Sequence, residues 1–208
     1  MNLNKHPGKL FIISGPSGAG KGTIAKRILE ETELEFSVSM TTRSPREGEI
    51  DGVHYYFVDE EAFLKNIEED GFLEHAEVYG KRYGTPKGPI LERLEKGTDV
   101  LLDIEMQGAL QVKEKYPEGV FIFILPPSMA ELRKRLTGRG TESPEAIEMR
   151  LSKTLSEIEY VDKYDYLVVN GVLEEAVNRG KAIIIAEHSK VTVTPEELIR
   201  EYTKGEEK

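Results

Sequence analysis

The stretch that decides the fold is Gly15-Pro16-Ser17-Gly18-Ala19-Gly20-Lys21-Gly22-Thr23. Before it comes Leu10-Phe11-Ile12-Ile13, a short β-rich apolar run that is typical of a buried parallel strand. After it, Ile24, Ile28 and Leu29 recur at helical spacing. Glycines between a strand and a helix let successive backbone N–H groups curl around phosphate oxygens, and the helix N-terminus adds its dipole. The stretch therefore predicts a phosphate-binding turn.

Three positions of the turn match the pattern G-x-x-x-x-G-K, namely Gly15, Gly20 and Lys21. Lys21 is placed to reach the β- and γ-phosphates of a nucleotide. Gly22 stands where a Ser or Thr hydroxyl usually binds Mg²⁺, and Thr23 follows one residue later. Direct ligation of the metal by the turn is thus left open, and the alternative is a glycine-rich turn that binds nothing.

The composition is that of a soluble globular protein, with 38% apolar and 32% charged residues in 208. The length suits one α/β domain with insertions. A formal charge of −10 disfavours nucleic acid and anionic membranes as partners. The absence of cysteine excludes disulfides and thiolate nucleophiles, and no stretch approaches the roughly 18 apolar residues of a membrane span. We expect a cytoplasmic protein.

Strand-like and helix-like segments alternate along most of the chain, which predicts an α/β fold: a mainly parallel sheet flanked by helices. The run from Val100 to Glu105 is a strand that ends in two acids, Asp103 and Glu105. In open α/β sheets ligands bind outside the carboxyl ends of the strands, where the phosphate turn also lies. We therefore expect one of these acids to face the nucleotide site.

A small insertion interrupts this alternation. Short alternating runs at 36–40, 53–58 and 72–78 predict strands, Asp59 is a helix cap, and residues 81–86 are predicted as a basic, turn-rich loop. The insertion is predicted to be a subdomain of short antiparallel strands.

Arginines form a second signal in this acidic chain. Arg43 and Arg46 flank a proline in a loop, while Arg135 and Arg139 are four residues apart before a glycine-rich break. Each alone is typical of a solvated surface. Beside a phosphate turn, two basic clusters on separate insertions indicate a clamp, one part holding an acceptor phosphate and the other closing over the donor, because phosphoryl transfer needs cations placed around the transferred group.

Three further side chains have two interpretations each. Tyr55 and Tyr83 either pack in the core of the small subdomain or donate hydrogen bonds to a phosphate. Glu74 lies between Leu73 and Ala76 in an otherwise apolar alternation, which favours a pocket over a solvated strand face.

At these residues the chain resembles guanylate kinases of the bacterial type over nearly its whole length. The most diagnostic motif is the run Thr41-Thr42-Arg43-x-Pro45-Arg46. The other motifs that carry the resemblance are the turn at 15–23, the residues around the run at 37–49, and Tyr83-Gly84-Thr85, Asp103-Ile104-Glu105-Met106-Gln107-Gly108 and Leu136-Thr137-Gly138-Arg139-Gly140.

The resemblance implies a P-loop NTPase fold and transfer of a phosphoryl group from ATP to GMP in purine nucleotide metabolism, with Mg²⁺ required. It implies a core at 1–35, 88–126 and 151–208, a GMP-binding subdomain at 36–87 and a lid at 127–150. Whether dGMP is also a substrate is open, as is the oligomeric state.

The resemblance also implies roles for single residues. Those expected at the GMP phosphate are Arg43, Arg46, Tyr55 and Tyr83, and those expected around guanine are Ser39, Glu74, Thr85 and Glu105. The turn at 15–23 is expected to bind ATP, and the expected catalytic residues are Lys21, Arg46, Arg135, Arg139 and Arg150. Asp103 is the expected metal ligand, directly or through water.

Two alternatives remain at this point. One is another P-loop nucleoside- or sugar-phosphate kinase, because Lys21-Gly22-Thr23 also resembles adenylate kinases. The other is a guanylate-kinase-like interaction module without catalysis, although such modules typically lack an intact phosphate turn.

Overall fold

The structure is a computed structural model that describes residues 7–78, 80–138 and 143–203. Its larger sheet is five-stranded and parallel, in the order β2-β7-β1-β8-β9. The strands are β1 (Leu10–Ser14), β2 (Glu35–Phe36), β7 (Val100–Asp103), β8 (Val120–Leu125) and β9 (Tyr166–Val169). The predicted parallel sheet is confirmed, and β1, which leads into the phosphate turn, lies at its centre.

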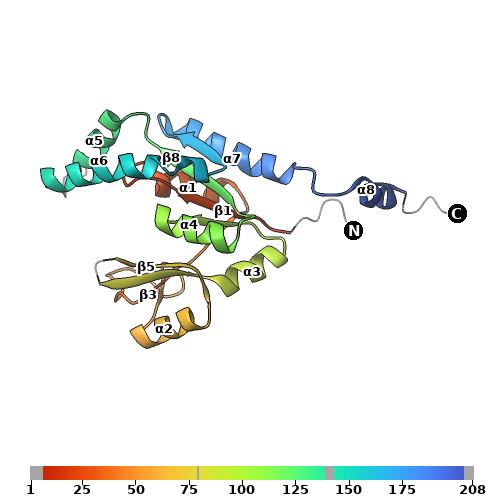
Figure 1. Cartoon of the computed structure of the whole chain (residues 1–208), viewed down its shortest axis with the longest axis horizontal. Coiled ribbons are helices and arrows are strands. Elements are labelled where there is room, and N and C mark those ends of the chain that lie inside the picture. Colours follow the sequence, from red (N-terminus) through yellow and green to blue (C-terminus); the bar gives the residue numbers. More distant parts are fainter. Residues whose placement is uncertain (1–6, 79, 139–142, 204–208) are drawn as a thin grey trace.

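Helices cover both faces of this sheet (Figure 1). Because side chains alternate along a strand, Phe11 and Ile13 pack on one face, and Leu10 and Ile12 pack on the other. The first face is covered by α1 (Lys21–Glu31) and α7 (Leu173–His188), and the second by α3 (Lys87–Glu95) and α4 (Met106–Lys115). Both faces of the sheet are therefore buried, which explains the nearly continuous apolar strand sequences.

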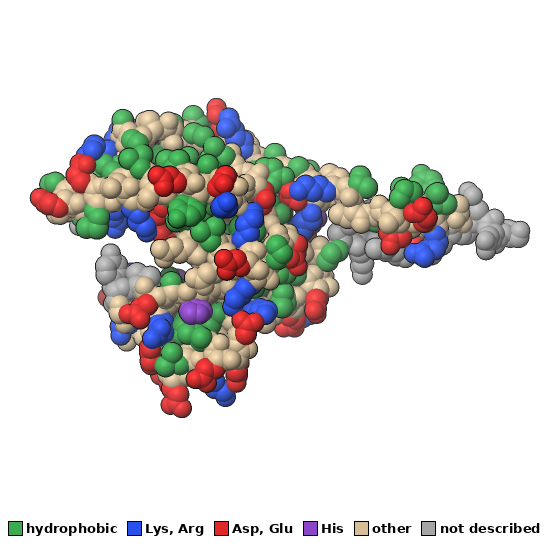
Figure 2. Space-filling model, in the orientation of Figure 1, with side chains coloured by type: hydrophobic (Ala, Val, Ile, Leu, Met, Phe, Trp, Pro, Cys, Tyr) green, Lys and Arg blue, Asp and Glu red, His purple; other side chains and the backbone are tan. Residues whose placement is uncertain are grey.

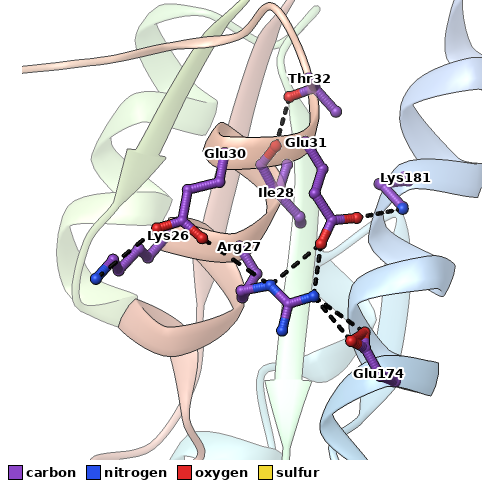
Figure 3. Close-up of polar contacts among 8 residues, drawn as sticks. All are labelled: Lys26, Arg27, Ile28, Glu30, Glu31, Thr32, Glu174 and Lys181. Carbon is purple, nitrogen blue, oxygen red and sulfur yellow. Dashed lines mark hydrogen bonds and ion pairs between the residues drawn. The ribbon is translucent and has the colours of Figure 1, made fainter.

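Charged side chains join α1 to α7 at the surface (Figure 3). The Nη2 atom of Arg27 lies 2.7 Å from Glu31 and 2.8 Å from Glu174, and the Nζ atom of Lys181 lies 2.5 Å from Glu31. Such exposed pairs contribute little to stability. They link the two helices side by side, and the first residue of α1 is Lys21 of the phosphate turn.

A second, four-stranded sheet has the order β4-β3-β6-β5. Its strands and the helix between them are β3 (Met40–Thr41), β4 (Tyr56–Phe57), α2 (Glu60–Glu68), β5 (Phe72–Val78) and β6 (Lys81–Pro86). Helix α4 lies between the two sheets, in contact with both β5 and β1 (Figure 1). The predicted cap of α2 is confirmed, because the Asp59 carboxylate accepts a hydrogen bond from the N–H of Ala62.

Three expectations for this insertion were wrong. Residues 81–86, predicted as a loop, form strand β6 and pair with β5 in a hairpin. The glycine that looked like a turn signal, Gly84, instead makes room for the ring of Phe72, since a Cβ there would lie 2.8 Å from Phe72 Cδ1. The sheet is also not wholly antiparallel, because β3 and β4 pair in parallel.

The third difference concerns residues 36–40, predicted as one run. They divide between the sheets: Phe36 belongs to β2 and pairs with β7, whereas Met40 belongs to β3. Each part finds its hydrogen-bonding partners in a different sheet, which local alternation does not reveal.

Two helices pack against each other and contact the glycine-rich turn, α5 (Met129–Thr137) and α6 (Pro144–Ile158). They share a small apolar cluster of their own, formed by Leu132, Leu136, Ile147 and Leu151. Both helices begin at a serine cap: Ser128 Oγ accepts from the N–H of Glu131, and Ser143 Oγ accepts from the N–H of Ala146. Helix α6 continues through residue 150, the proposed end of the lid.

The remaining elements are a 3₁₀ turn at Val161–Lys163 and helix α8 (Pro195–Tyr202), which projects from the body in Figure 1. Helix α8 begins with a capping box formed by Thr194 and Glu197. In the ranges that the structure describes, every helix is too short or too polar to span a lipid bilayer.

Candidate nucleotide site

The glycine-rich turn joins the carboxyl end of β1 to the amino end of α1. Gly15 and Gly20 have φ angles of 142° and 92°, which side chains rarely adopt. A Cβ on Gly15 would lie 2.2 Å from the carbonyl oxygen of Ile124, and one on Gly20 would lie 2.4 Å from Asn170 Nδ2. Only glycine therefore fits these two positions of the predicted turn.

Lys21 lies across the turn that precedes it. Its Nζ atom donates to the carbonyl oxygens of Gly15, at 2.6 Å, and Pro16, at 3.3 Å. These carbonyls stabilise the ammonium group at the mouth of the turn. A nucleotide phosphate bound by the backbone N–H groups would meet this cation directly.

A cavity of about 520 Å³ opens beside the turn, and its other wall consists of Asp103, Ile104 and Glu105. The predicted convergence of the acids on the turn is thus present in the structure. Burial raises the pKa of Asp103, and the charge of Lys21 opposes that rise. Glu105 is exposed and faces Lys153 at 3.6 Å.

The donor atoms around this cavity fit a magnesium ion that keeps much of its water. Thr23 lines the cavity, and a Cβ on Gly22 would lie 3.5 Å from Asp103 Oδ2. In the described ranges no cluster of three or more His, Cys, Asp or Glu residues could hold a metal alone. Magnesium is commonly bound by one or two carboxylates together with phosphate oxygens and water.

Two of the three predicted donor-site arginines contact the turn. Arg135 donates from Nη1 to the carbonyl oxygen of Ala19, at 3.3 Å, and Arg150 donates from Nη1 to Ser17 Oγ, at 2.7 Å. They come from α5 and α6, so these helices carry positive charge to the phosphate turn. The third, Arg139, lies outside the described residues.

The sequence analysis did not single out Asn170, which is 5% exposed at the end of β9. Its Nδ2 atom donates to the carbonyl oxygen of Ala19 at 2.8 Å, and its own carbonyl oxygen accepts from Arg135 at 2.9 Å. Asn170 thus ties the turn to α5. A polar residue at the carboxyl end of a predicted parallel strand was the available signal.

The acceptor-side residues gather in the second sheet. The guanidinium carbon of Arg43 lies 5.4 Å from the ring centre of Tyr55, whose ring centre lies 6.0 Å from that of Tyr83. Arg46 is exposed in the same loop, and its backbone N–H donates to Glu49 at 2.7 Å. The structure therefore brings Arg43 and both tyrosines together, and leaves the Arg46 side chain in solvent.

Glu74 is buried in the same sheet, on β5, with 8% of its surface exposed. It pairs in register with Thr85 across β5 and β6, and the Thr85 hydroxyl donates to Glu74 Oε1 at 2.5 Å. Burial raises the pKa of Glu74, and the hydrogen bonds from Thr85 oppose that rise. The hydrogen bonds from Thr85 therefore offset only part of the effect of burial on this carboxylate.

Ser39 directly precedes β3, in which Met40 pairs with Gly84. The same antiparallel register places Ser39 opposite Thr85. Ser39 and Thr85, two residues predicted to line the base pocket, therefore lie opposite each other. The third, Glu105, lies beside the phosphate turn.

The molecule is hollowed between the body that carries α5 and α6 and the smaller sheet, at the left of Figure 2. A second cavity, of about 540 Å³, lies at the amino-terminal end of β1, away from the turn, around Leu10, Leu94 and Tyr116. None of the predicted site residues lines it.

Comparisons with known proteins identify the family. The model of the guanylate kinase family matches residues 7–187. A guanylate kinase of Caldanaerobacter subterraneus subsp. tengcongensis is 57% identical over 188 residues, which are 90% of this chain and 91% of that protein. One from Clostridium acetobutylicum is 52% identical over 192 residues, 92% of each chain.

A solved structure gives the same result at the level of the fold. The crystal structure of guanylate kinase from Anaplasma phagocytophilum is 38% identical, has a TM-score of 0.72 and covers 91% of both chains. The chain therefore belongs to the guanylate kinase family.

Proposed function

We propose that this chain transfers the γ-phosphoryl group of ATP to GMP, giving ADP and GDP. The observation that carries the proposal is the pairing of a phosphate turn with a second polar site in the small sheet, which holds a buried carboxylate, Glu74, and a cluster of Arg43 with two tyrosines. The guanylate kinase names of its relatives support the same reaction. Both nucleotides are cytoplasmic metabolites, so the enzyme would act in the cytoplasm.

On the donor side, Lys21 and the backbone N–H groups of the turn would hold the β- and γ-phosphates of ATP. Arg135, Arg150 and Arg139 would balance the negative charge that spreads over the transferred group. Preorganised cations of this kind are the main source of catalysis in phosphoryl transfer, because there is little covalent chemistry for the protein to perform.

On the acceptor side, Arg43, Arg46, Tyr55 and Tyr83 would hold the GMP phosphate. One of its oxygens attacks the γ-phosphorus while the bond from that phosphorus to the β-phosphate oxygen breaks, so ADP leaves in line with the attack. The attacking oxygen is already anionic and needs no general base. The protein contributes position, which raises the rate by making the step effectively unimolecular.

Guanine would be selected by Glu74. Its carboxylate can accept from both N1–H and the exocyclic N2–H₂ of guanine, whereas adenine presents an acceptor at N1. The neighbouring donors Thr85 and Ser39 would complete the pocket, and the carboxylate of Glu105 would approach the base from beside the phosphate turn. A carboxylate that stays buried and unpaired with the wrong base gives discrimination of roughly 10⁴ or more.

Mg²⁺ would be held by the phosphates of ATP, by water and by Asp103 or Thr23. When bound, it neutralises phosphate charge that the turn and the arginines do not reach.

The chain would work as three parts: the core, a GMP-binding subdomain at 36–87 and a lid at 127–150. Closure of the two smaller parts would exclude water and suppress ATP hydrolysis. The hollow between them in Figure 2 is the space that closure would fill.

The test is a coupled ADP-release assay with GMP, dGMP, AMP, CMP, UMP and ribose phosphates as acceptors. We expect turnover with GMP, and in Glu74→Gln a loss of GMP kcat/KM of about 10²-fold or more with little change for AMP. Glu77→Gln, on the same strand but exposed, is the control and should leave both values unchanged. An unchanged GMP/AMP ratio in Glu74→Gln would remove Glu74 from the base pocket.

The same assay distinguishes the alternatives. Preference for another acceptor would identify a different phosphate kinase, and no turnover with any acceptor would identify an interaction module. The complete turn, with Lys21 bonded to it, favours an enzyme.

A further inference from the structure

Strand β5 of the small sheet is hydrogen-bonded to helix α4 of the core through the side chain of Gln111. Gln111 Oε1 accepts from the N–H of His75 and Gln111 Nε2 donates to the carbonyl oxygen of His75, both at 3.1 Å. One amide thus satisfies both backbone groups of a single residue. The residue it fixes directly follows Glu74.

Two more contacts hold the same part of β5 against α4. The Nζ atom of Lys115 donates to the carbonyl oxygen of Phe72 at 2.8 Å. Leu73 is 1% exposed and belongs to the apolar cluster that also contains Ala109 and Val112 of α4. Residues on both sides of Glu74 are therefore anchored to the core.

The carboxylate of Glu74 itself lies against α4, at Gly108. A Cβ on Gly108 would lie 2.8 Å from Glu74 Oε2, 3.2 Å from Cδ and 3.3 Å from Cγ. Thr85 holds the other oxygen, Oε1, from the opposite side. Because Gly108 has no side chain, the Glu74 carboxylate can occupy the space where a Cβ would lie.

We propose that Gln111 and Gly108 are positioning residues for base recognition: Gln111 fixes the backbone that carries Glu74, and Gly108 leaves room for its carboxylate. This proposal rests on the proposed function of Glu74. These contacts would hold the backbone and the carboxylate of Glu74 in one fixed position against α4.

The reason is geometric. A carboxylate that accepts two hydrogen bonds from one base edge needs both oxygens in the plane of that edge, and small misplacements lose both bonds together. Nothing about this role requires contact between α4 and the nucleotide. Loss of positioning should therefore raise KM for GMP and weaken the GMP/AMP preference, while KM for ATP stays unchanged.

The first experiment compares Gly108→Ala with Gly88→Ala. Gly88 is also near the start of a helix, and an added Cβ there would meet nothing within 4 Å. We expect Gly108→Ala to raise KM for GMP about tenfold or more without lowering the melting temperature, because alanine favours a helix and the displaced group is a side chain. Gly88→Ala should keep the GMP kinetics of the parent protein.

The second experiment replaces Gln111 by Met, which has similar length and cannot form the two hydrogen bonds. Glu114→Gln, at an exposed position of the same helix, is its control. Because Gln111→Met also loosens packing between the two sheets, the decisive measurement is a double-mutant cycle with Glu74→Gln. Positioning residues act through Glu74, so Gly108→Ala and Gln111→Met should add little to the GMP defect of Glu74→Gln.

The outcomes separate this proposal from the proposed function. If Glu74→Gln loses GMP selectivity but Gly108→Ala and Gln111→Met keep the parent KM for GMP, the positioning role is wrong and the function stands. Effects that are fully additive with Glu74→Gln would also overturn the positioning role. If the parent protein does not phosphorylate GMP, the proposed function fails first.

Discussion

The two Nη atoms of Arg43 lie 2.8 and 2.9 Å from the two carboxylate oxygens of Glu49, a bidentate ion pair within one loop. The guanidinium of Arg43, helped by the backbone N–H of Arg46, lowers the pKa of Glu49 to about 2. Glu49 is therefore ionised at any pH at which the enzyme works. A planar pair of this type fixes the orientation of the arginine as well as its charge.

The first prediction follows from this pair. Glu49→Gln should raise KM for GMP roughly tenfold, because Arg43 loses the carboxylate that orients it toward the acceptor phosphate. Glu47→Gln, two residues away and exposed, is the matched control. Steady-state kinetics with GMP varied at saturating ATP measure the effect; a KM equal to that of the control would show that Glu49 does not orient Arg43.

The second prediction concerns Lys21. Lys21→Met should lower kcat by about 10²-fold or more, the scale found when one preorganised donor to a transition-state charge is removed. The fold should persist, because the Lys21 ammonium bonds only to carbonyls of the turn in the contacts described here. Lys26→Met, on the exposed face of the same helix, should keep the parent kcat. The coupled assay measures the loss of kcat, and thermal melts measure whether the fold persists. Near-parent turnover in Lys21→Met would contradict the prediction.

Local sequence predicted most of the core. The apolar strands, the phosphate turn and the helix caps at Asp59, Ser128 and Thr194 are all set by residues that are neighbours along the chain. These features depend on short-range hydrogen bonds and periodicity, which a single sequence displays.

The features that the sequence did not predict depend on contacts between residues that are far apart along the chain. Strand β6 contains Gly84, which looks like a turn signal until Phe72 is seen to pack over it. Asn170 contacts the turn 151 residues away in sequence, and Gln111 contacts His75 from 36 residues away. No local pattern marks such a contact, because tertiary packing overrides propensity there.

The third prediction compares two glycines of the turn. Gly22→Ser should be tolerated and should lower the Mg²⁺ concentration needed for half-maximal activity several-fold, because its Cβ fits 3.5 Å from Asp103 Oδ2 and supplies a hydroxyl ligand. Gly20→Ala should lose ATP binding, since its Cβ would collide with Asn170 and its φ of 92° is strained for alanine. Magnesium titrations at fixed ATP test the first variant. A requirement that is unchanged or raised would mean that the metal lies elsewhere in the cavity.

The last prediction is the pH dependence of GMP recognition. Burial raises the pKa of Glu74 above its ordinary value of 4.5, whereas the proposed recognition of guanine requires the ionised carboxylate. As pH falls through the raised pKa, Glu74 takes up a proton and loses an acceptor, so KM for GMP should rise by up to about tenfold per pH unit below that pKa. The phosphate of GMP also titrates, with a pKa of about 6. Glu74→Gln retains that phosphate titration, and the difference between the two profiles from pH 8 to pH 5 isolates the carboxylate.

The raised pKa of Glu74 should also make the stability of the nucleotide-free protein depend on pH. Between pH 4.5 and the raised pKa the folded state binds the Glu74 proton and the unfolded state does not, so this group's contribution to stability falls as pH rises through that window. The ionised carboxylate is a cost to the folded protein at pH 8. Glu74→Gln should therefore raise the melting temperature more at pH 8 than at pH 5, whereas parallel KM profiles and an equal change in melting temperature at both values would mean that Glu74 keeps an ordinary pKa.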